Sequence, residues 1–69
     1  MEILQHFGLR IKTLRQERGL SQEKLAEIAD LHRTYINLVE SGKRNISLKN
    51  IYRLSKALGV SVKELFENL

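Results

Sequence analysis

Several residue types are absent or scarce in this chain, and each absence narrows its chemistry. The 69 residues include no cysteine, no proline and no tryptophan, and only four glycines. Without cysteine the chain can form neither a disulfide nor a thiolate metal site. His6 and His32 are too few and too far apart in the sequence to suggest a metal centre. The sequence therefore predicts a fold held together by packing, without a covalent or metal crosslink.

The sequence gives no sign of a membrane or of secretion. No apolar run is long enough to span a bilayer, and no signal-peptide pattern opens the chain. We therefore expect a cytoplasmic protein with no membrane partner.

No arrangement of residues suggests catalysis. The chain has no cysteine nucleophile and no glycine-rich phosphate loop. Its carboxylates fall mostly on the expected helix surfaces, where solvated charge is the usual finding. We expect neither an enzyme nor a cofactor or small-molecule ligand, which leaves binding functions.

The abundant residues favour an all-α fold. Leu, Ile, Lys, Glu and Ala dominate the composition, and proline, which breaks helices, is missing. A chain of 69 residues makes one domain, spanning 1–69. So short a domain buries only about 60% of its unfolded surface, which makes it marginally stable alone. Dimerisation would supply the stability that disulfides and metals do not.

Apolar periodicity and end signals predict five helices. Ser21, Ser47 and Ser61 are suitable N-caps, and glycines that can end helices stand at positions 19, 42 and 59. The predicted helices cover residues 2–18, 21 to about 29, about 32–41, 48–58 and about 62–68. The apolar stripes of the first and fourth helices would be buried: Leu4, Phe7, Ile11 and Leu14, then Leu48, Ile51, Leu54 and Leu58.

Residues 20–40 have the pattern of a helix-turn-helix. Two short apolar patterns are separated by a break at Asp30-Leu31-His32. The turn of this motif usually needs a residue at positive φ, for which glycine is the common choice. Here the position falls on Asp30, which tolerates that region better than most residues. Residues 32–41 would then form the helix that the motif presents to the DNA major groove.

The distribution of charge agrees with a nucleic-acid partner. The net charge is only +4, and residues 1–31 are balanced, with five Lys/Arg and five Asp/Glu. Residues 32–56 carry six cations against Glu40 alone, a net charge of +5, and residues 57–69 carry −1. Such a basic stripe is a candidate phosphate footprint. A solvated cationic face is the alternative that charge alone leaves open.

These motifs resemble a known family. GLSQEKLAEIADLHRTYINLVESGKRNISL and the later LSKALGVSVKELF resemble the phage-repressor-like (Cro/CI-type, XRE) helix-turn-helix domains over about residues 3–66. The segment LHRTYI, Glu40 and the basic loop Lys43-Arg44-Asn45 are more similar to the small controller proteins of restriction–modification systems. The resemblance implies a five-helix repressor-like domain and a homodimeric transcription regulator acting on its own operon. The alternative is a phage-type repressor, or an antitoxin or adaptor that uses this fold for a protein partner.

Helical spacing selects the side chains that would face the groove. With Ile36 and Val39 turned inward, those turned outward are Arg33, Thr34, Asn37, Leu38 and Ser41. Arg33 can pair with guanine, Thr34 can offer its hydroxyl or methyl group, and Asn37 can reach an adenine edge or a phosphate. In the resembled controllers, the positions of Arg33 and Thr34 contact bases. An ordinary solvent-facing helix surface is the competing interpretation.

Other polar residues are candidates for contacts with the DNA backbone. Gln22, at the start of the second helix, can join the free amides there in binding a phosphate. Tyr35 can reach a phosphate through its hydroxyl, or can instead pack half-buried on the fourth helix. The remaining candidates lie at the end of the third predicted helix and in the loop after it: Ser41, Lys43, Arg44 and Asn45. Arg44 could also extend to a base, and a merely solvated loop is the alternative for residues 43–45.

Two further expectations concern the core and the assembly. The resemblance implies a partly buried ion pair between Arg15 and Glu40. The fourth and fifth helices carry more apolar residues than a small core needs, which predicts a two-fold homodimer built on them. Its interface would contain Ile51, Tyr52, Val60, Val62, Leu65, Phe66 and Leu69. The partner would be a double-stranded operator with an inverted repeat.

Overall fold

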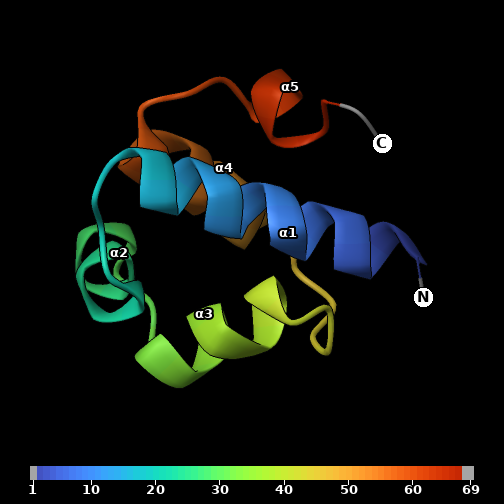
Figure 1. The fold of residues 1–69 in the computed structure, drawn as a ribbon, viewed down its shortest axis with the longest axis horizontal. Coiled ribbons are helices and arrows are strands. Elements are labelled where there is room, and N and C mark those ends of the chain that lie inside the picture. Colours follow the sequence, from blue (N-terminus) through green and yellow to red (C-terminus); the bar gives the residue numbers. More distant parts are fainter. Residues whose placement is uncertain (1, 68–69) are drawn as a thin grey trace.

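The computed structural model describes residues 2–67, which form five α-helices and no strand (Figure 1). The helices are α1 (Glu2–Glu17), α2 (Gln22–Ala29), α3 (Arg33–Glu40), α4 (Leu48–Leu58) and α5 (Val62–Leu65). In Figure 1, α1 crosses the middle of the molecule, with α2 and α3 below it, α5 above it and α4 behind it. The predicted all-α, five-helix fold is confirmed. Within the described range, no helix is both long and apolar enough to cross a membrane.

The helices begin at the serines that the sequence indicated. Each N-cap hydroxyl accepts a hydrogen bond from the backbone amide three residues later, at 3.0 to 3.2 Å: Ser21 from Lys24, Ser47 from Asn50 and Ser61 from Glu64. These bonds satisfy amides that the helix itself leaves free. The third helix starts without such help, because the side chain of its N-cap His32 makes no capping bond.

The turn between α2 and α3 has the unusual backbone expected of it. Asp30 lies at φ 58° and ψ 48°, in the left-handed region, and is the one non-glycine residue with positive φ in the described chain. The amide of Leu31 donates to the carbonyl of Ala26 at 2.9 Å, which closes the end of α2. The turn thus joins α2 to α3 through only three residues, 30–32.

The core forms where α1 crosses the other helices. Its buried members are Phe7, Ile11, Leu14, Leu25, Ala26, Ala29, Ile36, Val39, Leu54, Leu58 and Leu65. Leu48 was expected in this core, but its side chain is 79% exposed. It is the first residue of α4, and the neighbouring Ile46 and Ile51 pack against the core in its place.

Arg10 of α1 and Arg18, the residue just after α1, hold the ends of the last two helices. Arg18 Nε donates to the carbonyl of Leu58 at 2.5 Å, and Arg10 Nε donates to the carbonyl of Glu64 at 3.0 Å. Carbonyls near a helix C-terminus have no partner in their own helix and carry partial negative charge, so a cation there is favourable. These bonds fix α4 and α5 against α1.

The fifth helix differs from its prediction in two ways. It ends at Leu65 and not near residue 68, because Phe66 leaves the helical conformation and packs its ring on Phe7, with the ring centroids 5.1 Å apart. Leu65 was expected near a dimer axis, but its side chain is 0% exposed within the single chain. Leu65 therefore belongs to the core and is not available to a partner. Leu69, placed in the same interface, lies outside the described residues.

At Gly8, α1 comes close to the backbone at the end of α3. A Cβ atom added there would stand 2.2 Å from the carbonyl oxygen of Val39 and 2.7 Å from that of Glu40. Backbone atoms cannot move aside as a flexible side chain can. The absence of a side chain at Gly8 therefore sets how near α1 lies to the end of α3.

We expect Gly8→Ala to destabilise the protein although alanine is the better helix former by about 1 kcal/mol. The added methyl group would push α1 away from α3, and overpacking of this kind costs about 1–3 kcal/mol. Urea unfolding at fixed protein concentration measures the change. A variant as stable as the parent chain would contradict the close contact between these helices.

Candidate nucleic-acid interface

The outward face of α3 carries the polar residues predicted for it. Ile36 and Val39 are buried, at 0% and 2% exposure, so the opposite face of the helix is fixed toward solvent. Arg33, Thr34 and Asn37 lie on that exposed face. Leu38 was also expected to point outward, but it is only half-exposed. The burial of two apolar residues thus orients the three candidate base contacts.

The start of α2 and the outward face of α3 share one hollow. Its lining consists of Gln22, Arg33, Thr34 and Asn37. Three of these come from α3, and Gln22 is the first residue of α2. Four polar side chains from two helices therefore converge on one hollow with a volume of about 260 Å³, although Arg33 lies 11 positions after Gln22 in the sequence.

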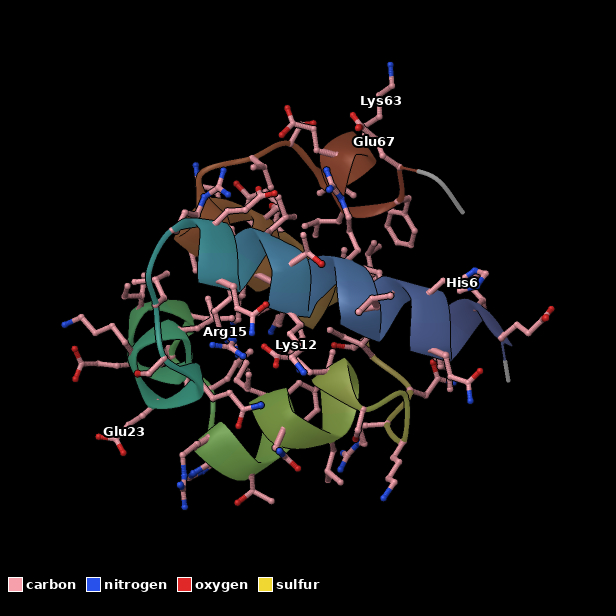
Figure 2. All side chains as sticks on the ribbon, in the orientation of Figure 1. His6, Lys12, Arg15, Glu23, Lys63 and Glu67 are labelled. Carbon is pink, nitrogen blue, oxygen red and sulfur yellow. The ribbon has the colours of Figure 1, made fainter. Side chains whose placement is uncertain are left out.

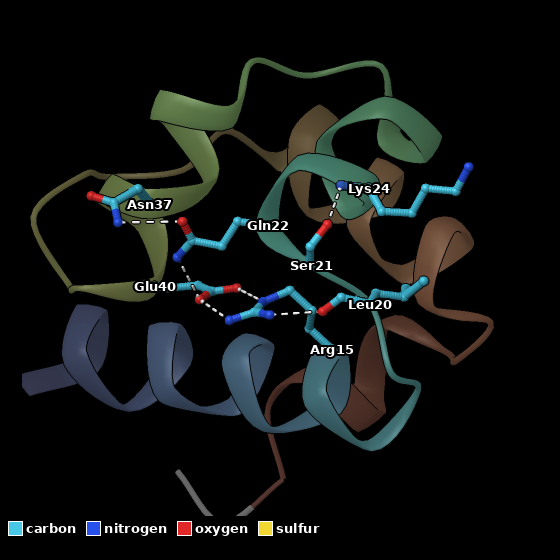
Figure 3. A network of polar contacts seen from close by, with 7 residues as sticks. All are labelled: Arg15, Leu20, Ser21, Gln22, Lys24, Asn37 and Glu40. Atoms are coloured by element: carbon cyan, nitrogen blue, oxygen red, sulfur yellow. Dashed lines mark hydrogen bonds and ion pairs between the residues drawn. The ribbon is translucent and has the colours of Figure 1, made fainter.

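A largely buried ion pair joins α1 to the end of α3 (Figure 3). Arg15 Nε donates to Glu40 Oε2 at 2.6 Å, and Arg15 Nη2 donates to Glu40 Oε1 at 3.0 Å. The side chains are 11% and 3% exposed, respectively. Arg15 Nη1 also donates to the carbonyl of Leu20 at 2.7 Å, in the loop before α2. The two residues that the resemblance paired are thus joined by a two-bond, largely buried contact.

Hydrogen bonds connect the ion pair to two of the candidate DNA contacts, Gln22 and Asn37. Gln22 Nε2 donates to Glu40 Oε1 at 3.0 Å, and Asn37 Nδ2 donates to Gln22 Oε1 at 3.4 Å. The sequence offered Gln22 only as a phosphate contact. Its side-chain oxygen instead accepts from α3, which leaves one N–H of its amide for a phosphate.

Tyr35 packs half-buried beside α4, which was the alternative to a phosphate contact. The side chain is half-buried against the core, and its hydroxyl accepts a hydrogen bond from Asn50 Nδ2 of α4 at 3.1 Å. Arg44 lies over the ring, with its guanidinium carbon 5.1 Å from the ring centroid. The hydroxyl proton of Tyr35 is still free to donate to a phosphate.

The loop after α3 presents charge to solvent. Lys43, Arg44 and Asn45 are all exposed, and Asn45 Oδ1 accepts from the backbone amide of Ile46 at 3.0 Å. Ser41 is exposed as well, and its hydroxyl donates to the carbonyl of Leu38 at 3.2 Å. Both contacts are local and order the polar groups near the helix end.

Among the residues that the structure describes, the cations of residues 32–56 form no ion pair with a carboxylate. The ion pairs within residues 2–67 join Arg10 to Glu67, Arg15 to Glu40, Arg18 to Glu17 and Lys24 to Glu27. All four pairs use cations that precede residue 32. The basic segment predicted from the sequence therefore keeps its charge available for an anionic partner.

One candidate escaped the sequence analysis. Lys12 of α1 lines a second hollow together with Gln22, Asn37, Glu40 and Ser41. Figure 2 shows Lys12 and Arg15 reaching from α1 toward α3, whereas Glu23 and Lys63 point away from the molecule. Lys12 precedes Arg15 by three residues and so shares its face of α1, which is the signal that could have identified it.

Comparison with known proteins places this geometry among DNA-binding regulators. A family model described as helix-turn-helix matches residues 11–65. The chain is 52% identical over 62 residues to the control protein C.BamHI of Bacillus amyloliquefaciens, covering 88% of this chain and 76% of that protein. It is 47% identical over 64 residues to the control protein C.MunI of a Mycoplasma species, covering 91% and 86%.

A solved structure agrees with these relatives. The fold is similar to the crystal structure of the restriction-modification controller protein C.AhdI from Aeromonas hydrophila, with a TM-score of 0.94 and 47% sequence identity. The match covers 96% of this chain and 100% of that one. The agreement therefore includes all the helices that build the hollow and the ion pair.

We expect the stability effects of Arg15 and Glu40 to be strongly coupled. Removing one partner, as in Arg15→Met or Glu40→Met, should cost about 3–5 kcal/mol because an uncompensated buried charge remains. The double variant should lose clearly less than the sum of the two, as urea unfolding at fixed protein concentration would show.

The exposed pair Lys24–Glu27 provides the control. Its atoms are also close, at 2.9 Å, but the side chains are 56% and 71% exposed. A double-mutant cycle there should give less than about 1 kcal/mol of coupling. Equal coupling in the two cycles would contradict the role assigned to burial.

Proposed function

Since this chain belongs to the helix-turn-helix family, as one of its restriction–modification controller proteins, we propose that it regulates its own operon by binding operator DNA as a homodimer. Proteins of this family are DNA-binding transcription regulators and not enzymes, and this chain is one of them. The operator, the dimer and the autoregulation are the proposed parts. The observation that carries operator binding is the hollow where Gln22, Arg33, Thr34 and Asn37 converge.

Base recognition is assigned to the first turns of α3. In this motif the N-terminal part of the second helix lies deepest in the major groove. Arg33 is exposed there and can form two hydrogen bonds with O6 and N7 of guanine, while Thr34 and Asn37 reach neighbouring base pairs. Arg44 is a further candidate for a base edge, although its contact with Tyr35 would have to yield.

Backbone contacts are assigned to polar groups around α3. Lys43, Asn45, Ser41 and the Tyr35 hydroxyl would bind phosphates on one side of the helix. On the other side, the remaining N–H of Gln22 would do so. These contacts supply affinity and fix the position of α3, without reading the sequence.

Dimerisation is supported by apolar surface on the last two helices. Tyr52 is 56% exposed and Phe66 is 36% exposed, and Val60 and Val62 are half-exposed. Ile51 is also half-buried. A two-fold dimer through α4 and α5, without Leu65, would place two copies of Arg33 about 34 Å apart, one turn of DNA. The operator would then be an inverted repeat with half-sites about 10 base pairs apart.

A protein-interaction module, such as an antitoxin or an adaptor, is the second candidate. The chain does expose an apolar and cationic hollow between α2 and α4, lined by Ile28, Tyr52, Arg53 and Lys56 among others. The face of α3, however, is polar. A gel shift with nonspecific duplex DNA across a salt series separates the two, because an adaptor would show no salt-dependent binding.

Arg33→Ala and Lys43→Ala should differ in kind. Losing Arg33 should cost about 1–3 kcal/mol on the best operator and relax the preference at one base pair. Losing Lys43 should weaken binding to all duplexes about equally and reduce the salt slope by about one unit. Binding titrations with a set of operator variants measure both. If Arg33→Ala left the ranking of the variants unchanged, Arg33 would not be a base reader.

Val62→Glu tests the dimer without disturbing the core. Val62 is half-exposed and lies outside the buried cluster, so the variant should fold but become a monomer. It should bind a full operator little better than a half-site, as sedimentation and binding titrations would show. Leu9→Glu makes the same change at a 59% exposed residue of α1 and should leave the dimer intact. A wild-type chain that is monomeric at micromolar concentration, with full operator affinity, would refute the dimer.

A further inference from the structure

The Arg15–Glu40 pair imposes a direction on the side-chain amide of Gln22. A glutamine amide has a donating end and an accepting end, which nearby atoms must distinguish. Glu40 Oε1 already accepts from Arg15, and a carboxylate held by a guanidinium offers only acceptor oxygens. The end of Gln22 that faces Glu40 at 3.0 Å must therefore be the donating Nε2. Its oxygen is turned toward α3 (Figure 3).

The same constraint passes to Asn37. Gln22 Oε1 accepts from Asn37 Nδ2 at 3.4 Å, so the accepting end of one amide meets the donating end of the next. A flipped Asn37 would place two oxygens against each other. Gln22 is half-buried and Asn37 is exposed, so the direction set at the buried pair reaches the solvent-facing surface of α3.

The Asn37 amide keeps one acceptor and one donor that a DNA base can use. One N–H is used by Gln22, which leaves the oxygen and the second N–H for a ligand. Adenine presents a donor at N6 and an acceptor at N7 in the major groove, and asparagine complements both at once. Guanine presents two acceptors there and would leave the asparagine oxygen without a donor.

We propose that Asn37 reads an adenine in the operator and that Gln22 is the positioning residue that holds its amide in the reading direction, itself oriented by the Arg15–Glu40 pair. This inference rests on the proposed function, because it takes for granted that α3 lies in the major groove. It gives Gln22 a role in sequence preference in addition to its phosphate contact. The buried ion pair thereby contributes to specificity as well as to stability.

The test compares base preference in the wild type and in five variants. An operator is first selected with the wild-type chain from a pool of random duplexes, and dissociation constants are then measured with each base at each position. Asn37→Ala identifies the position that Asn37 reads. At that position the wild type should prefer adenine by roughly 5- to 150-fold.

Gln22→Leu should lose most of that preference for adenine. It should keep the base preference at the operator position that Arg33 contacts. In the Asn37→Ala background, Gln22→Leu should change the preference by less than about twofold, since the reader is already gone. Gln22→Ala is measured in parallel as a smaller truncation, and thermal unfolding establishes that each variant is folded. Gln16→Leu, at an exposed glutamine of α1, is the matched control and should change no preference.

A modified base provides an independent measurement. Replacing the adenine by 7-deazaadenine removes the N7 acceptor and should weaken wild-type binding but not binding by Asn37→Ala. Equal weakening of all duplexes by Gln22→Leu would overturn the positioning role, because it is what a phosphate contact predicts. A wild type indifferent to 7-deazaadenine, or one that prefers another base there, would overturn the adenine assignment. A wild-type chain that selects no sequence at all would overturn the proposed function, and this inference with it.

Discussion

The bidentate contact between Arg15 and Glu40 is the constraint on which the arrangement of the first three helices depends. Arg15 comes from α1, Glu40 ends α3, and the third guanidinium bond goes to the carbonyl of Leu20 before α2. One guanidinium group therefore joins α1, the end of α3 and the loop that leads into α2. Because the pair is largely buried, each charge has lost most of its hydration, and its interaction with the opposite charge compensates for that loss.

A buried ion pair is not a strong source of stability by itself, since apolar residues of the same shape often stabilise a core equally well. What apolar residues cannot do is to orient a neighbouring amide. Glu40 receives Gln22 on the oxygen that it already shares with Arg15, and Gln22 in turn receives Asn37. The polar core thus explains both how α2 and α3 are held together and how polar groups are directed at the surface.

The sequence allowed much of the candidate site to be predicted because the site lies on one helix. Once Ile36 and Val39 are inside, the exposure of Arg33, Thr34 and Asn37 follows from a period of 3.6 residues. Lys12 was missed because it comes from another helix, and its place beside Gln22 and Ser41 depends on how α1 crosses α3. That crossing is set partly by Gly8, whose contact with the carbonyl of Val39 no local pattern reveals.

By itself, the sequence determined the helices and most of their ends, because caps, turns and apolar periodicity are local interactions. The Ser21 hydroxyl bonds an amide three residues away, and Asp30 is a residue type that tolerates the positive φ of its turn. Only the tertiary structure decided which apolar residues were inside. Leu48 fits the stripe of α4 but is exposed, and Leu65 looked like an interface residue but is buried, since burial depends on what packs from distant parts of the chain. The hydrogen bonds that link Glu40, Gln22 and Asn37 were likewise decided by the tertiary structure. Their direction is set by the Glu40 carboxylate, which folding brings to Arg15 although the two residues are 25 positions apart in the sequence.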